Sequence, residues 1–589
     1  MIEAGYIKSG ALVNKKFREF FMSTVLMSVA AQLGVIIDSI IVGNMIDSSA
    51  MASVSICMPL NQVSSALSLL ISVGAGGLAA IASGARQHEE ADKIFTAVTV
   101  LSLLLGILMT AVCLPFAWEL ADFLATEDTL DKSGWEYLHV MIWRFPFMFV
   151  LTSISVLIRS DGMPGLASQA VILGQITNVT LDILFIKYMN MGLPGVALTT
   201  VISDIVSSFY MLLFYFISSE RTFHFVSIKK YGLKAFLSLC WKLIVSGVPA
   251  ATGVALVAVK VWCIYAILAE IGDESAIAIY AVCMSCLGFV SMFITGSHRA
   301  MIPVAGVLYG EKDYGAVRML VRYVLCFTLS IIGVFVLFVL VFPQAILQLF
   351  NILPEAIIEG LDAVRLFSVS LLGVTVTFLM IYYYTTVQQR FVANMLSWTE
   401  GLLAVVPLAW FLSRIMGFDG VWVAFILAEI IGFLCLFVCV KFICKSSGGK
   451  YSDIYLIEKK EKTLLYDVSI KATNNDASKI SDEVIRVLTD SGVAHSTANK
   501  AGVALEEITA NLSNYTGNKK PADIDIRIGN TDGLIVISLR DNGKPFNPVD
   551  YTPSEMTEYQ TDGIMLLKAI AKNIQYNRVL SLNQTIIEI

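Results

Sequence analysis

The sequence predicts a polytopic α-helical membrane protein, with twelve spans arranged as two six-helix lobes, followed by a C-terminal α/β domain. Three observations support this fold class. Of the 589 residues, 56% are hydrophobic and only 15% are charged, and the mean hydropathy is +0.74, as in a membrane protein with a soluble part attached. Apolar runs long enough to cross a bilayer recur between residues 19 and 443. From residue 446 onward the chain is polar.

The apolar runs fall into two groups of six. The first group lies at about 19–42, 52–82, 94–117, 136–157, 165–187 and 195–217, and the second at about 239–268, 276–297, 318–342, 363–386, 391–413 and 420–443. The predicted domains are an N-terminal segment (1–18), an N-lobe (19–217), a basic linker (218–238), a C-lobe (239–445), a second linker (446–463) and a C-terminal domain (464–589).

The charge distribution predicts the orientation of the chain in the lipid bilayer. Most Lys and Arg residues of the connecting segments fall on the side of the N-terminus, among them Lys15, Arg86, Lys229 and Lys312. Because positive loops stay inside, both termini are expected in the cytoplasm. The N-terminus has no small-residue cleavage site, so no removable signal peptide is expected. The net charge of −6 and the lack of a basic, aromatic cluster argue against nucleic acid binding.

The two groups of spans form an internal repeat. The segment Met191-Gly-Leu-Pro-Gly-Val reappears 225 residues later as Met416-Gly-Phe-Asp-Gly-Val, and the same offset carries Asp204 onto Glu429. A parallel duplication of six spans predicts two lobes related by an axis along the membrane normal, with substrate between or within them. The roles of Asp204 and Glu429 stay open between packing and lining the pathway.

Polar side chains inside the apolar runs indicate a functional site. Asn178 and Asp182 are four residues apart, so they share one face of the fifth predicted span, and Asp38 lies in the first. A carboxylate in the middle of a membrane helix costs roughly 2.5–3.5 kcal/mol, so it should face a polar cavity rather than lipid. A purely structural role in helix packing is the alternative.

The membrane part resembles the multidrug and toxic compound extrusion (MATE) transporters over residues 15 to 443. The resemblance rests on Val35-Ile-Ile-Asp38 followed by Val42-Gly43, on the glycine-rich end of the second span with its Ala-Arg turn, and on Asn178 and Asp182. It implies a secondary transporter of the bacterial inner membrane that exports small organic compounds, often cations, in exchange for H⁺ or Na⁺.

The same resemblance places Asp38, Asn178, Asp182 and Thr200 together inside the N-lobe as the ion-coupling site. Physical chemistry supports that role independently, because a partly desolvated carboxylate beside a second one can bind and release a proton near neutral pH. The same oxygen atoms could instead hold Na⁺. We expect a proton rather than Na⁺.

The second lobe departs from the acids that some MATE transporters carry there. Its seventh span contains Lys260 and its eleventh span contains Glu400. The two side chains are expected either to form a buried ion pair with a structural role or to contact the substrate.

The C-terminal domain alternates helix and strand patterns. We predict helices near 480–488 and 496–515, strands at 524–528 and 534–539 joined by a turn, a helix over 563–573 and a closing strand.

With its run Arg540-Asp541-Asn-Gly543-Lys-Pro-Phe-Asn-Pro, this domain resembles the GHKL-type ATP-binding fold, most closely the anti-sigma-factor serine kinases. The resemblance implies binding of ATP with Mg²⁺. It assigns Glu507 as general base, Asn511 as Mg²⁺ ligand, Asp541 as acceptor for the adenine amino group, Gly543 as the residue passing close to the base, and Gly563 to the phosphate loop. That loop departs from the expected Gly-x-Gly, because Thr561 and Asp562 precede Gly563.

The sequence therefore predicts a cation-coupled antiporter with a cytoplasmic nucleotide-binding regulatory domain, to which a cytoplasmic regulatory protein could bind. No Walker-type phosphate loop is present, which argues against a pump driven directly by ATP hydrolysis. Two alternatives remain: a membrane-anchored serine/threonine kinase that uses the transporter part as a sensor, and a flippase for lipid-linked precursors.

Overall fold

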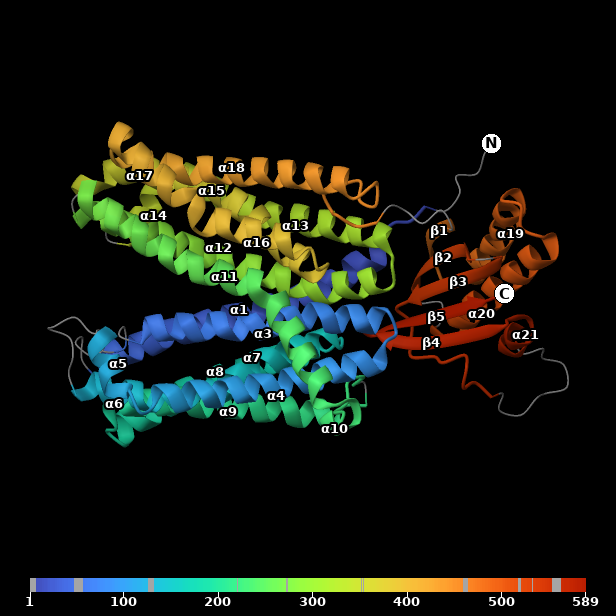
Figure 1. Ribbon diagram of the computed structural model, residues 1–589, viewed down its shortest axis with the longest axis horizontal. Helices are drawn as coiled ribbons and strands as arrows, with labels where there is room; N and C mark the ends of the chain where they lie inside the picture. Colours follow the sequence, from blue (N-terminus) through green and yellow to red (C-terminus); the bar gives the residue numbers. More distant parts are fainter. Residues whose placement is uncertain are drawn as a thin grey trace. The chain divides into compact units, whose positions relative to one another are not determined.

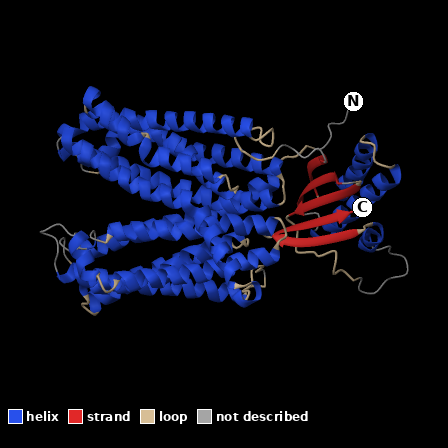
Figure 2. Cartoon of the chain, in the orientation of Figure 1, coloured by secondary structure: helices blue, strands red, loops and turns tan. Residues whose placement is uncertain are grey.

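The computed structural model describes residues 7–46, 54, 57–124, 132–219, 221–271, 274–350, 352, 354–458, 464–516, 521–531, 533–552 and 563–589. The chain forms two compact units. The helical unit comprises residues 18–312 and 321–457, and the sheet unit comprises residues 1–17, 313–320 and 458–589. All described strands belong to the sheet unit (Figure 2).

Among the described residues, twelve helices are long and apolar enough to cross a membrane, which confirms the predicted number of spans. Those of the first half contain α1 (Ala11–Met45), α3 (Met58–Gly84), α4 (His88–Cys113), α6 (Lys132–Met141) with α7 (Phe145–Ser160), α8 (Pro164–Ile183) and α9 (Gly192–Ile217). Those of the second half contain α11 (Leu233–Ile271), α12 (Glu274–Gly310), α13 (Tyr314–Val341), α15 (Pro354–Thr386), α16 (Arg390–Trp398) with α17 (Val405–Met416), and α18 (Phe418–Ser446). Short helices α5 (Ala117–Leu124), α10 (Ile228–Tyr231) and α14 (Pro343–Leu349) connect them.

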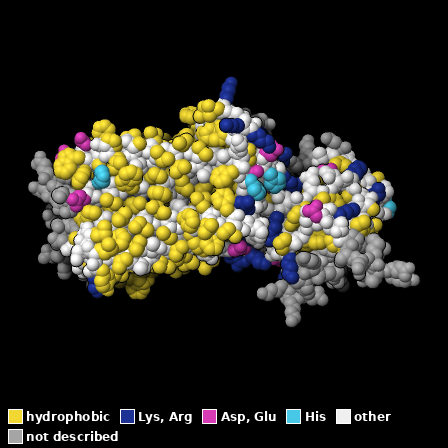
Figure 3. Space-filling view, turned by 90° about the horizontal axis from the view of Figure 1, so that it is seen from below, with side chains coloured by type: hydrophobic (Ala, Val, Ile, Leu, Met, Phe, Trp, Pro, Cys, Tyr) yellow, Lys and Arg dark blue, Asp and Glu magenta, His cyan; other side chains and the backbone are white. Residues whose placement is uncertain are grey.

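The helices of each half lie together as one bundle, blue to teal for the first half and green to orange for the second (Figure 1). Large hydrophobic side chains are exposed along the outside of the helical unit, among them Val35, Leu108, Val334 and Phe442. They dominate the face of this unit shown in Figure 3. Contact with lipid accounts for this surface, because water would disfavour so large an apolar area.

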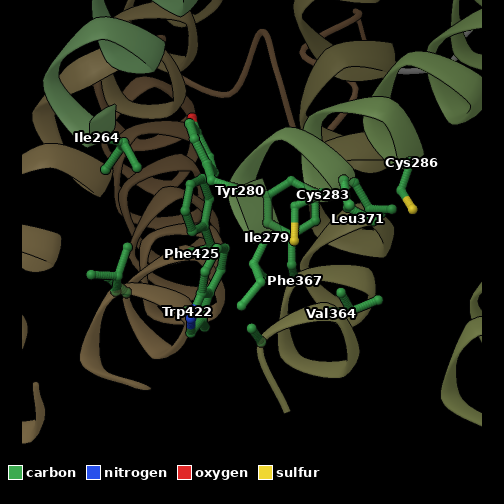
Figure 4. Close-up of a cluster of buried hydrophobic side chains, with 14 of the residues drawn as sticks. Ile264, Ile279, Tyr280, Cys283, Cys286, Val364, Phe367, Leu371, Trp422 and Phe425 are labelled. Atoms are coloured by element: carbon green, nitrogen blue, oxygen red, sulfur yellow. The ribbon is translucent and has the colours of Figure 1, made fainter. Parts of the chain in front are cut away.

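The second bundle has an aromatic core. Tyr280 from α12, Phe367 from α15, and Trp422 and Phe425 from α18 are buried together, as Figure 4 shows. The rings of Phe367 and Phe425 pack edge to face with centroids 5.0 Å apart. These side chains fix α18 against α12 and α15, and so place the polar residue Glu429 of α18 at a defined depth.

Glycines allow α3 to pack closely on two helices of the second half. A Cβ atom at Gly247 of α11 would lie 1.8 Å from the carbonyl oxygen of Leu70. A Cβ atom at Gly84 would lie 2.1 Å from the carbonyl oxygen of Val307 on α12, and one at Gly310 would lie 2.2 Å from that of Ile81. Such short distances mean that only glycine fits at these crossings.

The sheet unit contains one antiparallel five-stranded sheet with strand order β1-β2-β3-β5-β4. The strands are β1 (Leu464–Lys471), β2 (Asp523–Thr531), β3 (Leu534–Asp541), β4 (Asn573–Val579) and β5 (Leu582–Glu588). Helices α19 (Asn474–Asp490), α20 (His495–Thr516) and α21 (Gly563–Ile570) pack against the apolar face of the sheet to form its core. This arrangement confirms the predicted small α/β domain.

Two parts of the sheet were not predicted from the sequence. Strand β1 precedes the first predicted helix, and the predicted single closing strand is a hairpin of β4 and β5. The hairpin turn consists of Leu580 and Ser581, both with positive φ (55° and 59°). Such turns usually carry Asn-Gly or Asp-Gly, so this one gave no turn signal. Helix α21 accordingly ends at Ile570, before the predicted residue 573.

Candidate functional site

Three helices of the first bundle bring polar side chains together. Asp38 comes from α1, Asn178 and Asp182 from α8, and Thr199 from α9. Asn178, Asp182 and Thr199 are buried, whereas Asp38 is partly buried. The four-residue spacing predicted Asn178 and Asp182 on one helix face, and tertiary packing adds Asp38 and Thr199.

The hydrogen bonds of this cluster link its members directly. The hydroxyl of Thr199 donates to Asp182 Oδ1 at 2.5 Å. With its amide nitrogen facing Asp38, Asn178 donates to the two carboxylate oxygens of Asp38 at 2.8 and 3.1 Å. Asp38 and Asp182 interact electrostatically, and Asp182 Oδ2 has no hydrogen-bond partner among the described residues. A proton or a cation would satisfy that oxygen.

The position predicted for Thr200 in this cluster is taken by its neighbour. The hydroxyl of Thr200 donates to the backbone carbonyl of Val196 at 3.2 Å, along its own helix. Successive residues of an α-helix point about 100° apart, so only one of two adjacent threonines can face the acids. The sequence alone does not indicate which of two adjacent threonines faces the acids.

A second charged pair lies beside the first cluster. Arg144 Nε is 2.6 Å from Asp204 Oδ2, and the positive charge of Arg144 also acts on Asp38. Asp204, whose role the sequence left open, is therefore an ion-pair partner. Arg144 was not predicted as a site residue, although an arginine inside an apolar span is itself a signal of function.

The second bundle contains a buried polar cluster of its own. Lys260 Nζ on α11 lies 2.8 Å from Glu400 Oε1 and 3.2 Å from the backbone carbonyl of Glu400. Glu429 on α18 is in hydrogen-bond contact with Glu400 and accepts from the Thr377 hydroxyl at 2.9 Å. Two carboxyl groups share one ammonium group, so the cluster is neutral only when one acid holds a proton.

Each acid cluster adjoins a π-helical turn. The turn at Leu184–Tyr188 begins two residues after Asp182, and the turn at Thr399–Leu403 contains Glu400. Single π turns within α-helices occur frequently at functional sites, because the extra residue widens the helix and shifts the side chains around it.

The sheet unit contains the residues predicted for nucleotide binding. Glu507 and Asn511 lie on α20, and a Cβ atom at Gly563, the first residue of α21, would lie only 1.8 Å from a carboxylate oxygen of Glu507. The buried amide oxygen of Asn511 has no partner among the described residues. An unpaired amide oxygen one helical turn after Glu507, whose carboxylate lies at the glycine that begins α21, suits a bound Mg²⁺–phosphate group. Thr561 and Asp562 lie outside the described residues.

Asp541 is held at the end of β3 by two donors to the same oxygen. The side-chain amide of Asn583 and the backbone N–H of Gly543 each donate to Asp541 Oδ1 at 2.8 Å. Oδ2 is therefore the oxygen available to a ligand. Burial raises the pKa of Asp541 to about 6, although these donors and Arg578 act in the opposite direction. Asn583 was not predicted, because its approach depends on the unpredicted β4–β5 hairpin.

The polar face of the sheet carries a buried charge network. Residues alternate between the two faces of a strand, so Asp467 and Arg540 point away from the apolar core. Lys8 Nζ lies 2.7 Å from Asp467 Oδ1 and 3.0 Å from Asp313 Oδ2, and Arg540 Nη2 lies 3.3 Å from Asp313 Oδ2. Burial alone would raise the pKa of Asp313, but Lys8, Arg527 and Arg540 hold that pKa well below its usual value.

Comparison with known proteins identifies the helical unit. The chain matches the MatE family over residues 24–184 and 249–411, together more than half of its length. The chain belongs to the MATE family. Residues 470–589 match a histidine kinase-like ATPase domain, so this MATE protein carries such a domain at its C-terminal end.

Curated relatives of this MATE protein include two bacterial proteins. The multidrug export protein MepA of Staphylococcus haemolyticus is 23% identical over 426 residues, which cover 72% of this chain and 92% of the relative. The probable multidrug resistance protein YoeA of Bacillus subtilis is 23% identical over 347 residues, 58% of this chain and 74% of the relative.

Solved structures share the fold of the MATE part. An outward-facing multidrug resistance MATE family transporter superposes with a TM-score of 0.68 and 19% identity, covering 74% of this chain and 97% of that one. A transporter from Pyrococcus furiosus, described as having a binding pocket of reverse polarity, gives a TM-score of 0.65 and 20% identity, covering 74% of this chain and 97% of that one.

Proposed function

We propose that this MATE protein is a cation-coupled antiporter of the bacterial inner membrane, with both termini in the cytoplasm, that exports small organic compounds. The observation that carries this proposal is the acid pair of Asp38 and Asp182. It joins two membrane helices and leaves one buried carboxylate oxygen without a donor in the described part of the chain. A group of this kind gains free energy by taking up a cation.

The coupling ion that this arrangement favours is a proton. One proton between Asp38 and Asp182 would satisfy the unpaired Asp182 Oδ2 and remove the repulsion between the two acids. A Na⁺ ion would find oxygen ligands in the same cluster. The positive charge of Arg144 opposes either cation, so the preference for a proton rests on the unpaired Asp182 Oδ2.

Helix α1 provides the connection between ion binding and the second bundle. In the N-terminal half of this helix, the Thr24 hydroxyl donates to the backbone carbonyl of Gly296 on α12 at 2.9 Å, and a Cβ atom at Gly296 would lie 2.3 Å from Val25. About four helical turns further on, the same helix carries Asp38. Neutralising Asp38 would loosen one end of α1 while the other stays attached to α12, so α1 would bend or shift.

The first prediction tests the coupling. Asp38→Asn or Asp182→Asn is expected to reduce gradient-driven efflux of fluorescent anionic and cationic dyes about 5- to 150-fold, the range of a coupling free energy of about 1–3 kcal/mol. Efflux from cells is measured with and without a protonophore. Asp362→Asn is the control, because Asp362 is exposed and pairs only with the exposed Arg365. Full efflux in both acid variants would rule out this coupling site.

For the sheet unit we propose nucleotide binding that regulates the transporter. Asn511 would hold Mg²⁺, Asp541 Oδ2 would accept from the adenine amino group, and Gly543 and Gly563 would let the backbone approach the base and the phosphates. The bound metal would neutralise phosphate charge. The unpaired oxygen of Asn511 supports this assignment, as does the glycine at the start of α21, where a side chain would clash with Glu507.

The second prediction concerns ATP binding to the full-length protein. Asp541→Asn and Asn511→Ala are each expected to weaken Mg²⁺-ATP binding about tenfold, the equivalent of about 1.4 kcal/mol. Titration calorimetry measures the dissociation constants, and Asp490→Asn, at the exposed end of α19, is the control. Wild-type protein that binds no ATP at millimolar concentration would contradict the proposal.

A second candidate function is transfer of phosphate from ATP to a serine of a partner protein. The position of Glu507 beside Gly563 supports it, because a carboxylate there could accept the proton of an attacking hydroxyl. Incubation of the full chain with labelled ATP and cytoplasmic extract would reveal a labelled partner. Loss of that label in Glu507→Gln, with ATP binding retained, would identify the kinase activity.

A further inference from the structure

A cavity lies between the two bundles of the helical unit. It encloses about 780 Å³ of space not filled by protein atoms, its open mouth included. Helices α1, α3, α7, α8 and α12 provide its walls. Most of the lining is apolar, from residues such as Met27, Val73 and Ile302. This lining suits the apolar body of an organic molecule.

The ionisable groups of the cavity wall are all basic. Arg159 projects from α7, and His298 and Arg299 are adjacent on α12. Arg159 and His298 are buried, whereas Arg299 is partly exposed. His298 stacks on Tyr382 with ring centroids 3.6 Å apart, and its Nδ1 atom has no partner among the described residues. A fixed ring with an unpaired nitrogen offers a ready hydrogen bond to a ligand.

The two arginines have no compensating acid in the described structure. Arg159 Nη1 donates to Ser155 Oγ at 2.8 Å and lies 3.7 Å from Met27 Sδ, and both partners are neutral. None of the described residues places a carboxylate within salt-bridge distance of Arg159 or Arg299. The charged group that acts on Arg159 is Arg299 itself. Two like charges inside a protein are costly unless an anion joins them.

We propose that this cavity is the substrate site and that it binds the oxyanion group of an amphiphilic organic anion. A carboxylate, sulfonate or phosphate would accept hydrogen bonds from Arg159 and Arg299, because a planar guanidinium group can donate to two oxygen atoms of such a group at once. The apolar wall would hold the rest of the molecule. The proposal names the substrate class of the antiporter proposed above and rests on that function. It replaces the cationic cargo that family resemblance implied.

Binding to the full-length protein in neutral maltoside micelles tests the charge preference. The probes are 1-pyrenesulfonate and 1-pyrenemethylammonium, which share one aromatic body and differ in charge. We expect the sulfonate to bind at least tenfold more tightly. Arg159→Gln and Arg299→Gln should each weaken sulfonate binding about tenfold, with ammonium binding unchanged or improved. Arg299→Lys should retain more sulfonate affinity than Arg299→Gln, because it keeps the charge.

The matched control is Arg414→Gln, because Arg414 is exposed and pairs with the exposed Glu270 at 3.0 Å. It should leave both dissociation constants unchanged. Monodisperse elution and an unchanged melting temperature establish that each variant is folded. The proposal fails if pyrenemethylammonium binds wild-type protein as tightly as pyrenesulfonate. It also fails if the folded double variant Arg159→Gln/Arg299→Gln keeps full sulfonate affinity.

Competition distinguishes a soluble anion from a lipid headgroup. Displacement of pyrenesulfonate by lysophosphatidate but not by naphthalene-2-sulfonate would indicate a lipid-derived anion, and the opposite order a soluble one. Displacement by neither would overturn the proposal. The anion-site proposal and the antiporter proposal can also be contradicted independently. Tight sulfonate binding without gradient-driven efflux would contradict the antiporter but leave the anion site intact, whereas cation efflux without sulfonate binding would contradict only the anion site.

Discussion

Single carboxyl groups in this protein differ mainly in what surrounds them. Asp182 has a buried oxygen without a donor in the described structure, whereas Asp204 is neutralised by Arg144 at 2.6 Å. Asp541 is buried with two donors on one oxygen and the other oxygen available. The sequence marks all three as acids in apolar or strand contexts. Only their partners determine that the first suits ion uptake, the second an ion pair and the third ligand recognition.

Asp541 gives a pH prediction at the residue scale. Since burial raises its pKa to about 6, the acceptor form is lost below that pH, and ATP affinity should fall up to about tenfold per pH unit on further acidification. Between about pH 4 and 6 the folded domain binds more protons than the unfolded chain, because Asp541 keeps its proton only in the folded state. The free energy of unfolding therefore falls as the pH rises through this window.

The measurement is ATP affinity between pH 5 and 8 on the full-length protein. Asp541→Asn should remove the pH-dependent step, because the amide does not titrate in this range. An equally steep step in that variant would assign the dependence to another group.

At the scale of elements, the contact of α3 with α11 and α12 holds the bundles together. Glycines of the two halves lie there, Gly84 at the end of α3 and Gly310 at the end of α12. Close helix approach through small residues is a general means of packing in membranes, where burial of apolar surface gives no net gain.

The prediction at this scale is that Gly247→Ala disrupts the α3–α11 contact. The added methyl group would overlap the Leu70 carbonyl, and overpacking of this kind typically costs about 1–3 kcal/mol. Thermal unfolding of the purified protein should show a lower melting temperature. Gly288→Ala is the matched control on α12, because a Cβ atom there meets nothing within 4 Å. A control variant destabilised as strongly as Gly247→Ala would contradict the packing argument.

At the scale of the whole molecule, the sheet unit contains more of the chain than the C-terminal domain alone. Besides the ATPase-like domain, this unit includes residues 1–17 and 313–320, and helices α1 and α13 begin in it and continue in the helical unit. Asp313 joins the N-terminal segment to the sheet through Lys8 and Arg540. We infer that nucleotide-dependent changes in the sheet act on the transporter through these two helices.

Asp313→Asn tests this coupling. Removing one partner of a buried ion cluster typically costs about 3–5 kcal/mol, so hydrogen exchange at residues 7–17 should accelerate strongly, and dye efflux should lose its response to ATP. In the folded protein the pKa of Asp313 lies below its usual value, so the ionised side chain stabilises the fold at any pH above the usual carboxyl pKa. This stabilisation is lost as the pH falls through the pKa of the folded state. Asp490→Asn is the control, and an intact ATP response in Asp313→Asn would argue against this route.

By itself, the sequence determined the number of spans, the duplication, the two-part architecture and the grouping of Asn178 with Asp182, because hydropathy and helical periodicity are local properties. Only the tertiary structure decided that Thr199 rather than Thr200 reaches the acids, that Arg144 neutralises Asp204, and that Asn583 holds Asp541. It alone revealed Arg159, His298 and Arg299 around one cavity and Asp313 within the sheet unit. These contacts join residues far apart in the chain, and their geometry depends on how whole helices and strands pack.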